Sequence, residues 1–203
     1  PNHFLINIQP NEVTGVKAFL GERGLSSVEL FPMVRGRLMA INGRGVTPGD
    51  YDNPRAQRLV AREFNLSWTN RLQEDNRILS GRWWQDGDHG QGVASVEMGL
   101  AKDLGIALHD TLRFQIAGQM LEAQVVSLRS VEWDSFRANF FVVFPSGVLD
   151  GYPATWITSF HLPAGQKPLL AELVRRYPSV TVLDVEALMT KVRDIMDRVI
   201  AAV

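Results

Sequence analysis

One stretch of the sequence gathers the residue types that chemistry needs. The segment SVEWDSFRANFFVVF sets Asp134 and Arg137 among Trp133, Phe140 and Phe144. A carboxylate and a guanidinium beside aromatic rings are typical of a binding cleft, and with a histidine they could serve a soluble hydrolase. The segment also fits a core strand, because NFFVVF is a short apolar run that ends at a proline. We therefore expect the three aromatic residues to be structural, and the hydrolase stays as an alternative.

The remaining chemical motifs are incomplete. The loop DGDHG holds two carboxylates and His89, but it lacks the twelve-residue calcium pattern and its closing Glu. The four histidines have no metal-ligand spacing, and Ser146 is not in a G-x-S-x-G context. The loop GRGVTPG is neither a dinucleotide fingerprint nor a P-loop. The sequence therefore predicts no catalytic residue, no metal site, no cofactor site and no enzyme activity.

Two residue pairs could form a surface for a partner or a substrate. Arg35 and Arg37 alternate along MVRGRL, so both point to one face of a strand and could grip an anion. Such alternation is also typical of a solvated strand face. Trp83 and Trp84 are adjacent, and on a strand they would face opposite ways, so at most one is expected in the core.

The composition excludes some partners and leaves others open. The chain has 203 residues, is 45% hydrophobic and carries a net charge of −1. This charge argues against nucleic acid as a partner, because binding phosphates needs a basic face. Cysteine is absent, which removes disulfides and thiolate chemistry.

The two ends of the chain repeat one order of elements. Residues 4–8, 13–20 and 28–41 read as strand, helix and strand, and residues 155–162, 166–178 and 179–185 repeat that order. The sequence predicts an α+β fold in which residues 1–45 and 153–203 form one ferredoxin-like subdomain. Residues 46–152 then form an inserted, small β-rich subdomain. Its strongest local signal is a hairpin with alternating Leu112, Phe114 and Ile116.

The terminal helix has a narrow apolar seam. Its 3-4 spacing is typical of a coiled coil rather than of a broad globular face. The seam positions are Val185, Leu188, Val192, Ile195, Val199 and Ala202. Two interpretations stay open, a helix packed on its own sheet and a stalk that runs towards a membrane. No apolar run is long enough to span a bilayer, and the chain starts at Pro1 and ends in a helix without a stop signal. We therefore expect an excised piece of a longer protein.

Six segments follow one another in a specific order: LFPMVRGRLMAING, NRILSGRWW, VASVEMGLAKDLGI, DTLRFQIAG, SLRSVEWDSFRANFFVVFPSGVLD and PATWITSFHLP. In this order they resemble the periplasmic domain of FtsX-like, MacB-type ABC transporter permeases (type VII, or mechanotransmission, transporters). The likeness covers the whole chain and is closest to the YbbP group, whose long permeases carry two such domains, and this chain resembles the second.

The resemblance implies a non-catalytic domain on the periplasmic face of the bacterial inner membrane. Such domains have a "porter" subdomain made from both chain ends and an inserted "sabre" subdomain, and a cytoplasmic ATPase subunit drives their stalk. For the YbbP group it further implies a periplasmic lysophospholipase/thioesterase-type partner and extraction of hydrophobic or lipid-like substrates. A passive docking module for a secreted esterase is a further alternative.

Overall fold

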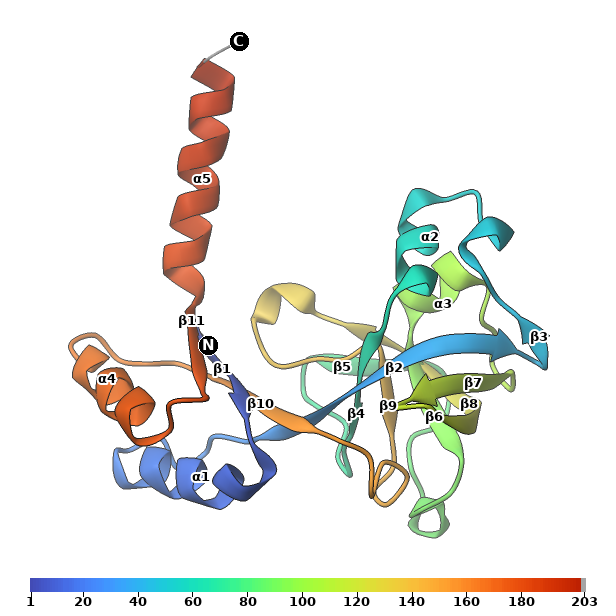
Figure 1. Cartoon of the computed structure of the whole chain (residues 1–203), viewed down its shortest axis with the longest axis horizontal. Coiled ribbons are helices and arrows are strands. Elements are labelled where there is room, and N and C mark those ends of the chain that lie inside the picture. The colour runs from blue at the N-terminus through green and yellow to red at the C-terminus, as the bar shows by residue number, and fades with distance from the viewer. Residues whose placement is uncertain (202–203) are drawn as a thin grey trace. The chain divides into compact units, whose positions relative to one another are not determined.

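The computed structural model describes residues 1–201 and divides into two compact units (Figure 1). Unit 1 comprises Pro1–Phe31, Asp134–Ala138 and the chain from Thr155 onward, and unit 2 comprises Pro32–Trp133 and Asn139–Ala154. The mixed α/β character agrees with the prediction from sequence. No helix in this part of the chain is both long and apolar enough to cross a membrane.

The predicted boundary at residue 45 was placed too late. The strand β2 (Phe31–Ile41) enters unit 2 at Pro32. From Val34 onward β2 pairs with strands of unit 2, so its hydrogen bonds place it there. Sequence periodicity marks a strand but does not reveal its pairing partner, which explains the error.

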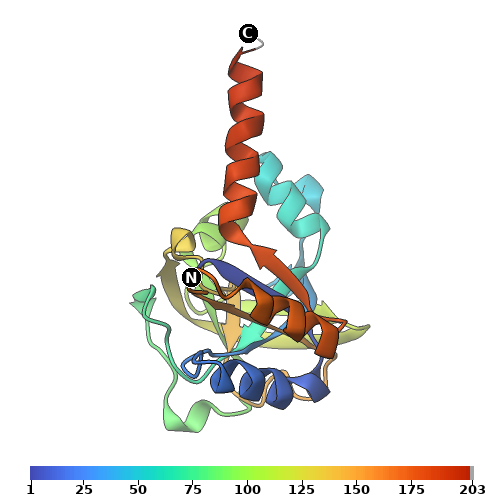
Figure 2. The same cartoon turned by 90° about the vertical axis from the view of Figure 1, so that its left-hand side faces the viewer.

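Unit 1 is built around a sheet with one central strand. Its elements are β1 (His3–Ile8), α1 (Val13–Glu22), β10 (Thr155–Phe160), α4 (Lys167–Arg176), β11 (Thr181–Asp184) and α5 (Val185–Ala201). β1 pairs antiparallel with β10 on one side and with β11 on the other, so segments far apart in the sequence share one sheet, as predicted. Figure 2 shows α1 and α4 in front of these strands.

The core of unit 1 lies between the two helices and the sheet. Leu5 and Ile8 of β1 meet Phe19 and Leu20 of α1 and Leu173 of α4, and all five are buried. The apolar residues of each helix recur at helical spacing and so form one buried face. This packing holds the two ends of the chain together.

Unit 2 is a small barrel with two short helices. Its other elements are β3 (Arg44–Gly45), α2 (Pro54–Ala61), β4 (Phe64–Trp68), β5 (Asn76–Gly81), β6 (Val93–Glu97), α3 (Met98–Leu104), β7 (Thr111–Ile116), β8 (Gln119–Val131) and β9 (Val142–Phe144). Pairing runs β2-β4-β9-β6-β8-β7 and returns to β2, which closes a ring of strands. Closure leaves these strands few free edges.

The hairpin turns follow their sequence signals. Asn42 and Gly43 have φ angles of 53° and 78°, and Ala117 and Gly118 have 49° and 80°. Positive φ at both central residues defines the tight turn that suits twisted strands. The predicted hairpin of β7 and β8 is confirmed, and its alternating residues Leu112, Phe114 and Ile116 are buried.

Phe140 and Phe144 are confirmed as core residues, but Trp133 is not. Phe140 and Phe144 are 5% and 0% exposed, whereas Trp133 is 46% exposed. Trp133 contacts the ring of Phe141 edge-on at 5.3 Å. The prediction failed for Trp133 because it lies in a single turn beyond the end of β8, outside the alternation that buries its neighbours.

Replacing Phe144 by Ala should destabilise the chain by about 3–5 kcal/mol, because a fully buried ring leaves a cavity. Replacing Trp133 by Ala is the control and should cost much less. Urea unfolding followed by circular dichroism measures both. Equal losses for the two variants would contradict the burial difference on which this prediction rests.

Candidate functional site

Unit 2 has a half-open groove of about 620 Å³. Its lining comes from β2, the end of α2 with the start of β4, and the segment that leads into β9. The lining residues are Arg35, Arg37, Leu59, Arg62, Glu63, Phe64, Asn65, Trp133, Asn139, Phe140 and Phe141. Ligand pockets typically enclose about 300–1,000 Å³, so the groove is large enough for a small molecule.

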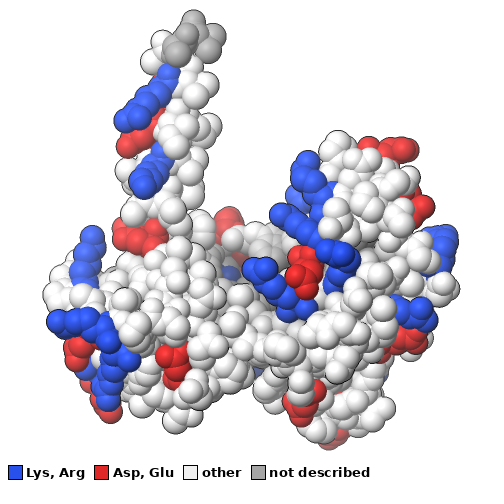
Figure 3. All heavy atoms as spheres, in the orientation of Figure 1, with Lys and Arg blue, Asp and Glu red and all other residues white. Residues whose placement is uncertain are grey.

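The basic part of the groove consists of three exposed arginines. Arg35 and Arg37 project from the same face of β2, with the buried Gly36 between them facing the core. A Cβ on Gly36 would lie 2.6 Å from Leu66 Cδ1, so glycine permits this close packing of β2 on β4. Arg62 follows the end of α2, and Glu63 is its acidic neighbour. Figure 3 shows basic side chains gathered on unit 2 beside the α2–β4 segment.

The apolar part of the groove consists of aromatic rings in mutual contact. Phe141 meets Phe64 edge-on at 6.3 Å and Trp133 at 5.3 Å, so the rings form a continuous row. Edge-to-face pairs of this kind are favourable beyond the area they bury. No local pattern places Arg62, Glu63 and Asn139 beside Arg35 and Arg37, because only the pairing of β4 with β2 and with β9 brings them together.

A buried arginine supports the wall of the groove from behind. Arg129 of β8 is 1% exposed, and its guanidinium donates to Ser95 Oγ at 3.1 Å, Asn76 Oδ1 at 2.7 Å and the Phe140 carbonyl at 2.5 Å. Asn76 Nδ2 in turn donates to the side-chain oxygen of Asn139 at 2.8 Å. Arg129 therefore links three strands to the groove-lining segment.

The charge of Arg129 is balanced by nearby carboxylates. Burial lowers its pKa to about 10, while the charges of Glu97 and Asp75 act in the opposite direction. The side chain is thus still a cation at neutral pH. Asp75 also accepts from Asn139 Nδ2 at 2.7 Å, and Glu97 caps α3 by accepting from the Gly99 and Leu100 amides.

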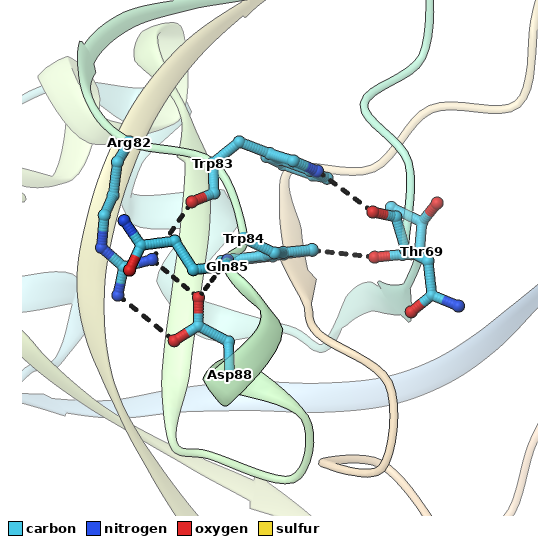
Figure 4. A network of polar contacts seen from close by, with 7 residues as sticks. Thr69, Arg82, Trp83, Trp84, Gln85 and Asp88 are labelled. Atoms are coloured by element: carbon cyan, nitrogen blue, oxygen red, sulfur yellow. Dashed lines mark hydrogen bonds and ion pairs between the residues drawn. The ribbon is translucent and has the colours of Figure 1, made fainter.

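The two tryptophans lie outside the groove and do not face opposite ways. Trp83 and Trp84 stack on each other with ring centroids 4.4 Å apart, and both are partly buried. The strand rule did not apply, because β5 ends at Gly81 before either tryptophan. Their indole N–H groups donate to the carbonyls of Asn70 and Thr69 (Figure 4). These hydrogen bonds connect the segment after β5 to the segment after β4.

An ion pair closes the same loop. Arg82 donates to both oxygens of Asp88, at 2.7 and 3.2 Å, and Asp88 also accepts from the Gln85 amide (Figure 4). The hydrogen bond from Arg82 lowers the pKa of Asp88 below its ordinary value. The loop DGDHG is therefore ordered by an arginine, and no cluster of metal-binding residues occurs among residues 1–201.

The residues of the hydrolase alternative do not converge. None of the described histidines makes a hydrogen bond or ion pair with Asp134. His89 Nδ1 lies instead 2.7 Å from Ser146 Oγ, and His3 contacts Asn2 and Asp184. The alternative needed a histidine within reach of Asp134, so it loses its geometric basis.

The seam of α5 is uncovered after its first residue. Val185 is 8% exposed, whereas Leu188, Val192, Ile195 and Val199 are 49–60% exposed. Ala202, the sixth seam position, lies outside the described residues. The helix extends away from the sheet of unit 1 (Figures 1 and 2), and its charged side chains lie along another side (Figure 3).

The base of α5 is fixed to the sheet of unit 1. Strand β11 passes into α5 without a loop, at Asp184 and Val185. The Asp184 carboxylate accepts from the Ala187 amide at 3.1 Å and lies 3.6 Å from His3 Nε2. The Val185 amide donates to the Asn2 carbonyl at 2.9 Å. The first turn of the helix therefore follows the position of β1 and β11.

Replacing Arg129 by Met should destabilise unit 2 by about 3–5 kcal/mol, because it removes the buried donor to Ser95, Asn76 and the Phe140 carbonyl and the positive charge near Glu97 and Asp75. Replacing the exposed Arg77 of β5 by Met is the matched control and should be close to neutral. The free energies of unfolding in urea provide the test. A neutral Arg129→Met variant would mean that the buried network contributes no net stability.

Replacing Asp184 by Ala should cost about 1 kcal/mol, because the first turn of α5 loses its capping acceptor. Asp184→Asn keeps an acceptor oxygen and should lose less. Helix content and unfolding midpoint of both variants are the measurements. If Asn is as damaging as Ala, the contact with His3 and not the cap stabilises this joint.

Comparison with known proteins gives a relative for nearly the whole chain. The chain is 41% identical over 192 residues, which is 95% of its own length, to the ABC transporter permease YbbP of Escherichia coli (strain K12). The chain spans 22% of the length of that relative. No protein-family model matches the chain. A crystal structure of a domain assigned to a permease from Porphyromonas gingivalis aligns with 89% of this chain and 85% of its own, at 10% identity and a TM-score of 0.39. That score is too low to support an argument.

The identity to YbbP confirms the resemblance inferred from the six sequence segments. The similarity extends over both units, because 192 of the 203 residues are aligned. Over nearly its whole length, the chain is therefore similar to one segment of the ABC transporter permease YbbP.

Proposed function

We propose that this chain is a non-catalytic periplasmic domain of an ABC transporter permease, the second of two, and that it couples ATP-driven movement of a stalk to extraction of hydrophobic or lipid-like molecules. A cytoplasmic ATPase subunit drives the stalk through the membrane part of the permease. A periplasmic lysophospholipase/thioesterase-type enzyme is the proposed partner. The similarity to YbbP supports the transporter class alone.

The observation that carries the proposal is the uncovered seam of α5. A helix that belonged only to this domain would bury its apolar stripe on the domain's own core. Here the stripe is exposed from Leu188 to Val199, over most of a helix of 17 residues. At 1.5 Å per residue such a helix is roughly 25 Å long, which suits a lever.

The base of α5 supports the same function. Rigid transmission requires that the helix and the sheet move together. The capping contact of Asp184 and the bond from Val185 to Asn2 join the helix to β11 and β1 without a flexible linker. Movement of α5 would then displace unit 1 as one body.

The sheet of unit 1 supports a ferredoxin-like porter. In that fold the first strand is central, with antiparallel neighbours that follow later in the chain, and two helices cover one face. β1 has these neighbours in β10 and β11, and α1 and α4 are the helices. We propose unit 2 as the inserted sabre subdomain.

Arg193→Pro in the full-length permease should uncouple ATP hydrolysis from transport. Proline inside a helix removes a backbone hydrogen bond and clashes with the preceding turn, at a cost of about 3 kcal/mol or more. Arg193 lies off the seam, so Arg193→Ala is the control for the lost charge and should be nearly silent. The measurement is transport of a fluorescent lipid-like amphiphile per ATP hydrolysed in reconstituted membranes.

The lever and the passive docking module predict different results in this assay. If the ratio is unchanged by Arg193→Pro, α5 is not a lever, and the domain is better described as a passive docking module. In that case the chain should capture an acyl esterase regardless of the state of the ATPase. If the ratio falls while both variants still assemble with the ATPase subunit, the lever is supported.

A further inference from the structure

The groove of unit 2 contains positive charge that the protein does not neutralise. The side chains of Arg35, Arg37 and Arg62 make no ion pair, hydrogen bond or ring contact with any residue in the described part of the chain. The other arginines of unit 2 include several with carboxylate partners, among them Arg55 with Asp103 and Arg113 with Glu122. Glu63 is the acidic residue of the lining, so the lining has a formal charge of three minus one, or +2.

The charged and apolar parts of the groove adjoin each other. The arginines come from β2 and the end of α2, while Phe140, Phe141 and Trp133 form the aromatic part. The Trp133 ring is half exposed although it is a large apolar group, so it offers contact area to a ligand. A ligand that fits both parts has an anionic end and an apolar body.

We propose that this groove binds single-chain amphiphiles with an anionic headgroup, such as a carboxylate, a phosphate or a sulfate. Guanidinium groups bind such oxyanions through paired, charge-assisted hydrogen bonds, and they do so better than lysines. The acyl chain lies along the row of Phe64, Phe141 and Trp133. This names a substrate class for the proposed transporter, and it rests on the proposed function only for where the amphiphile comes from.

A small amphiphile fits the groove better than an acidic peptide does. An added peptide strand would need an unpaired strand edge. The backbone of β2 is already paired, with β4 over Val34–Gly36 and with β7 over Arg37–Ile41. Nucleic acid is disfavoured as well, because three arginines and a net charge of −1 supply too little basic surface.

The wall of the groove is preorganised for this ligand. The Phe140 carbonyl accepts from the buried Arg129, and Asn139 is held by Asp75 and Asn76. The headgroup would meet exposed arginines, whereas the segment of Asn139 and Phe140 is held in place by hydrogen bonds. A fixed wall lowers the entropy cost of binding.

Calorimetric titration of the purified chain tests the proposal without the ATPase or transport. Dodecyl phosphate and dodecanoate, both below their micelle concentrations, are the probes. Dodecyl maltoside has the same chain without the charge, and inorganic phosphate has the charge without the chain. We expect both anionic amphiphiles to bind, at least tenfold more tightly than either control, and more weakly as salt is added.

Variants locate the binding site. Arg35→Gln and Arg37→Gln should each weaken dodecyl phosphate binding by about tenfold, since a hydrogen bond to a charged group is being lost. Arg77→Gln, an exposed arginine of β5 outside the groove, should leave the affinity unchanged. All three side chains are exposed, so the variants should unfold at the same urea concentration as the parent chain.

A brominated chain tests the apolar part of the groove. Bromine at the end of the alkyl chain should quench tryptophan fluorescence, and Trp133→Phe should abolish most of that quenching at ligand concentrations that saturate the variant in calorimetry. Full quenching in Trp133→Phe would place the chain elsewhere and overturn the assignment.

Four outcomes would reject the proposal. They are absence of binding below the micelle concentration, equal affinity for dodecyl maltoside, equal affinity for inorganic phosphate, and full affinity in both arginine variants. Displacement of dodecyl phosphate by an acidic peptide of equal affinity would assign the groove to a protein partner instead. Binding as predicted, together with an unchanged transport ratio in Arg193→Pro, would retain the amphiphile site and reject the lever.

Discussion

The buried charge of Arg129 is the constraint on which unit 2 depends. A guanidinium with 1% exposure is tolerated only when hydrogen bonds and opposite charges replace its water. Ser95 on β6, Asn76 on β5 and the Phe140 carbonyl provide the hydrogen bonds. Each acceptor lies on a different segment, so the requirement to satisfy one side chain fixes the relative positions of all three. The barrel surrounds this polar contact as much as it surrounds an apolar core.

Unit 2 contains both a buried, hydrogen-bonded arginine and exposed arginines that line the groove. Arg129 has every partner it needs and stays inside the fold. The side chains of Arg35, Arg37 and Arg62 have no hydrogen-bond or ion-pair partner among the described residues, and they line the groove. The segment that carries Asn139 and Phe141 is held on one side by the buried network and faces the groove on the other. One side of this segment therefore contributes to the buried hydrogen-bond network, and the other side lines the groove.

Unit 1 follows a different principle, in which one short joint fixes the base of α5 to the sheet. β1 is central, so its displacement would be felt by both β10 and β11. Asp184 and Asn2 attach α5 to those strands through a cap, a backbone bond and a contact with His3. A long helix with an exposed apolar seam needs a covering partner, and in a permease the neighbouring helices of the membrane part are proposed to supply it.

Local patterns in the sequence determined most of the elements. Alternation placed Leu112, Phe114 and Ile116 inside the barrel, the turn residues Asn42 and Gly43 fixed a hairpin, and helical spacing identified the seam of α5. These signals depend on residues within a few positions of each other, where backbone geometry alone decides which side chains share a face. The family resemblance was likewise readable from segments taken in order.

The tertiary structure decided what long-range pairing controls. The sequence could not show that β2 leaves unit 1 at Pro32, that Trp133 is exposed, or that Trp83 and Trp84 stack beyond the end of a strand. Arg62 and Asn139 carry no local signal that places them beside Arg35, because the groove exists only once β2 pairs with β4. The hydrogen-bond acceptors that replace water around Arg129 likewise come from residues 11 to 53 positions away in the sequence. Such contacts depend on strand order, and side-chain period does not encode strand order.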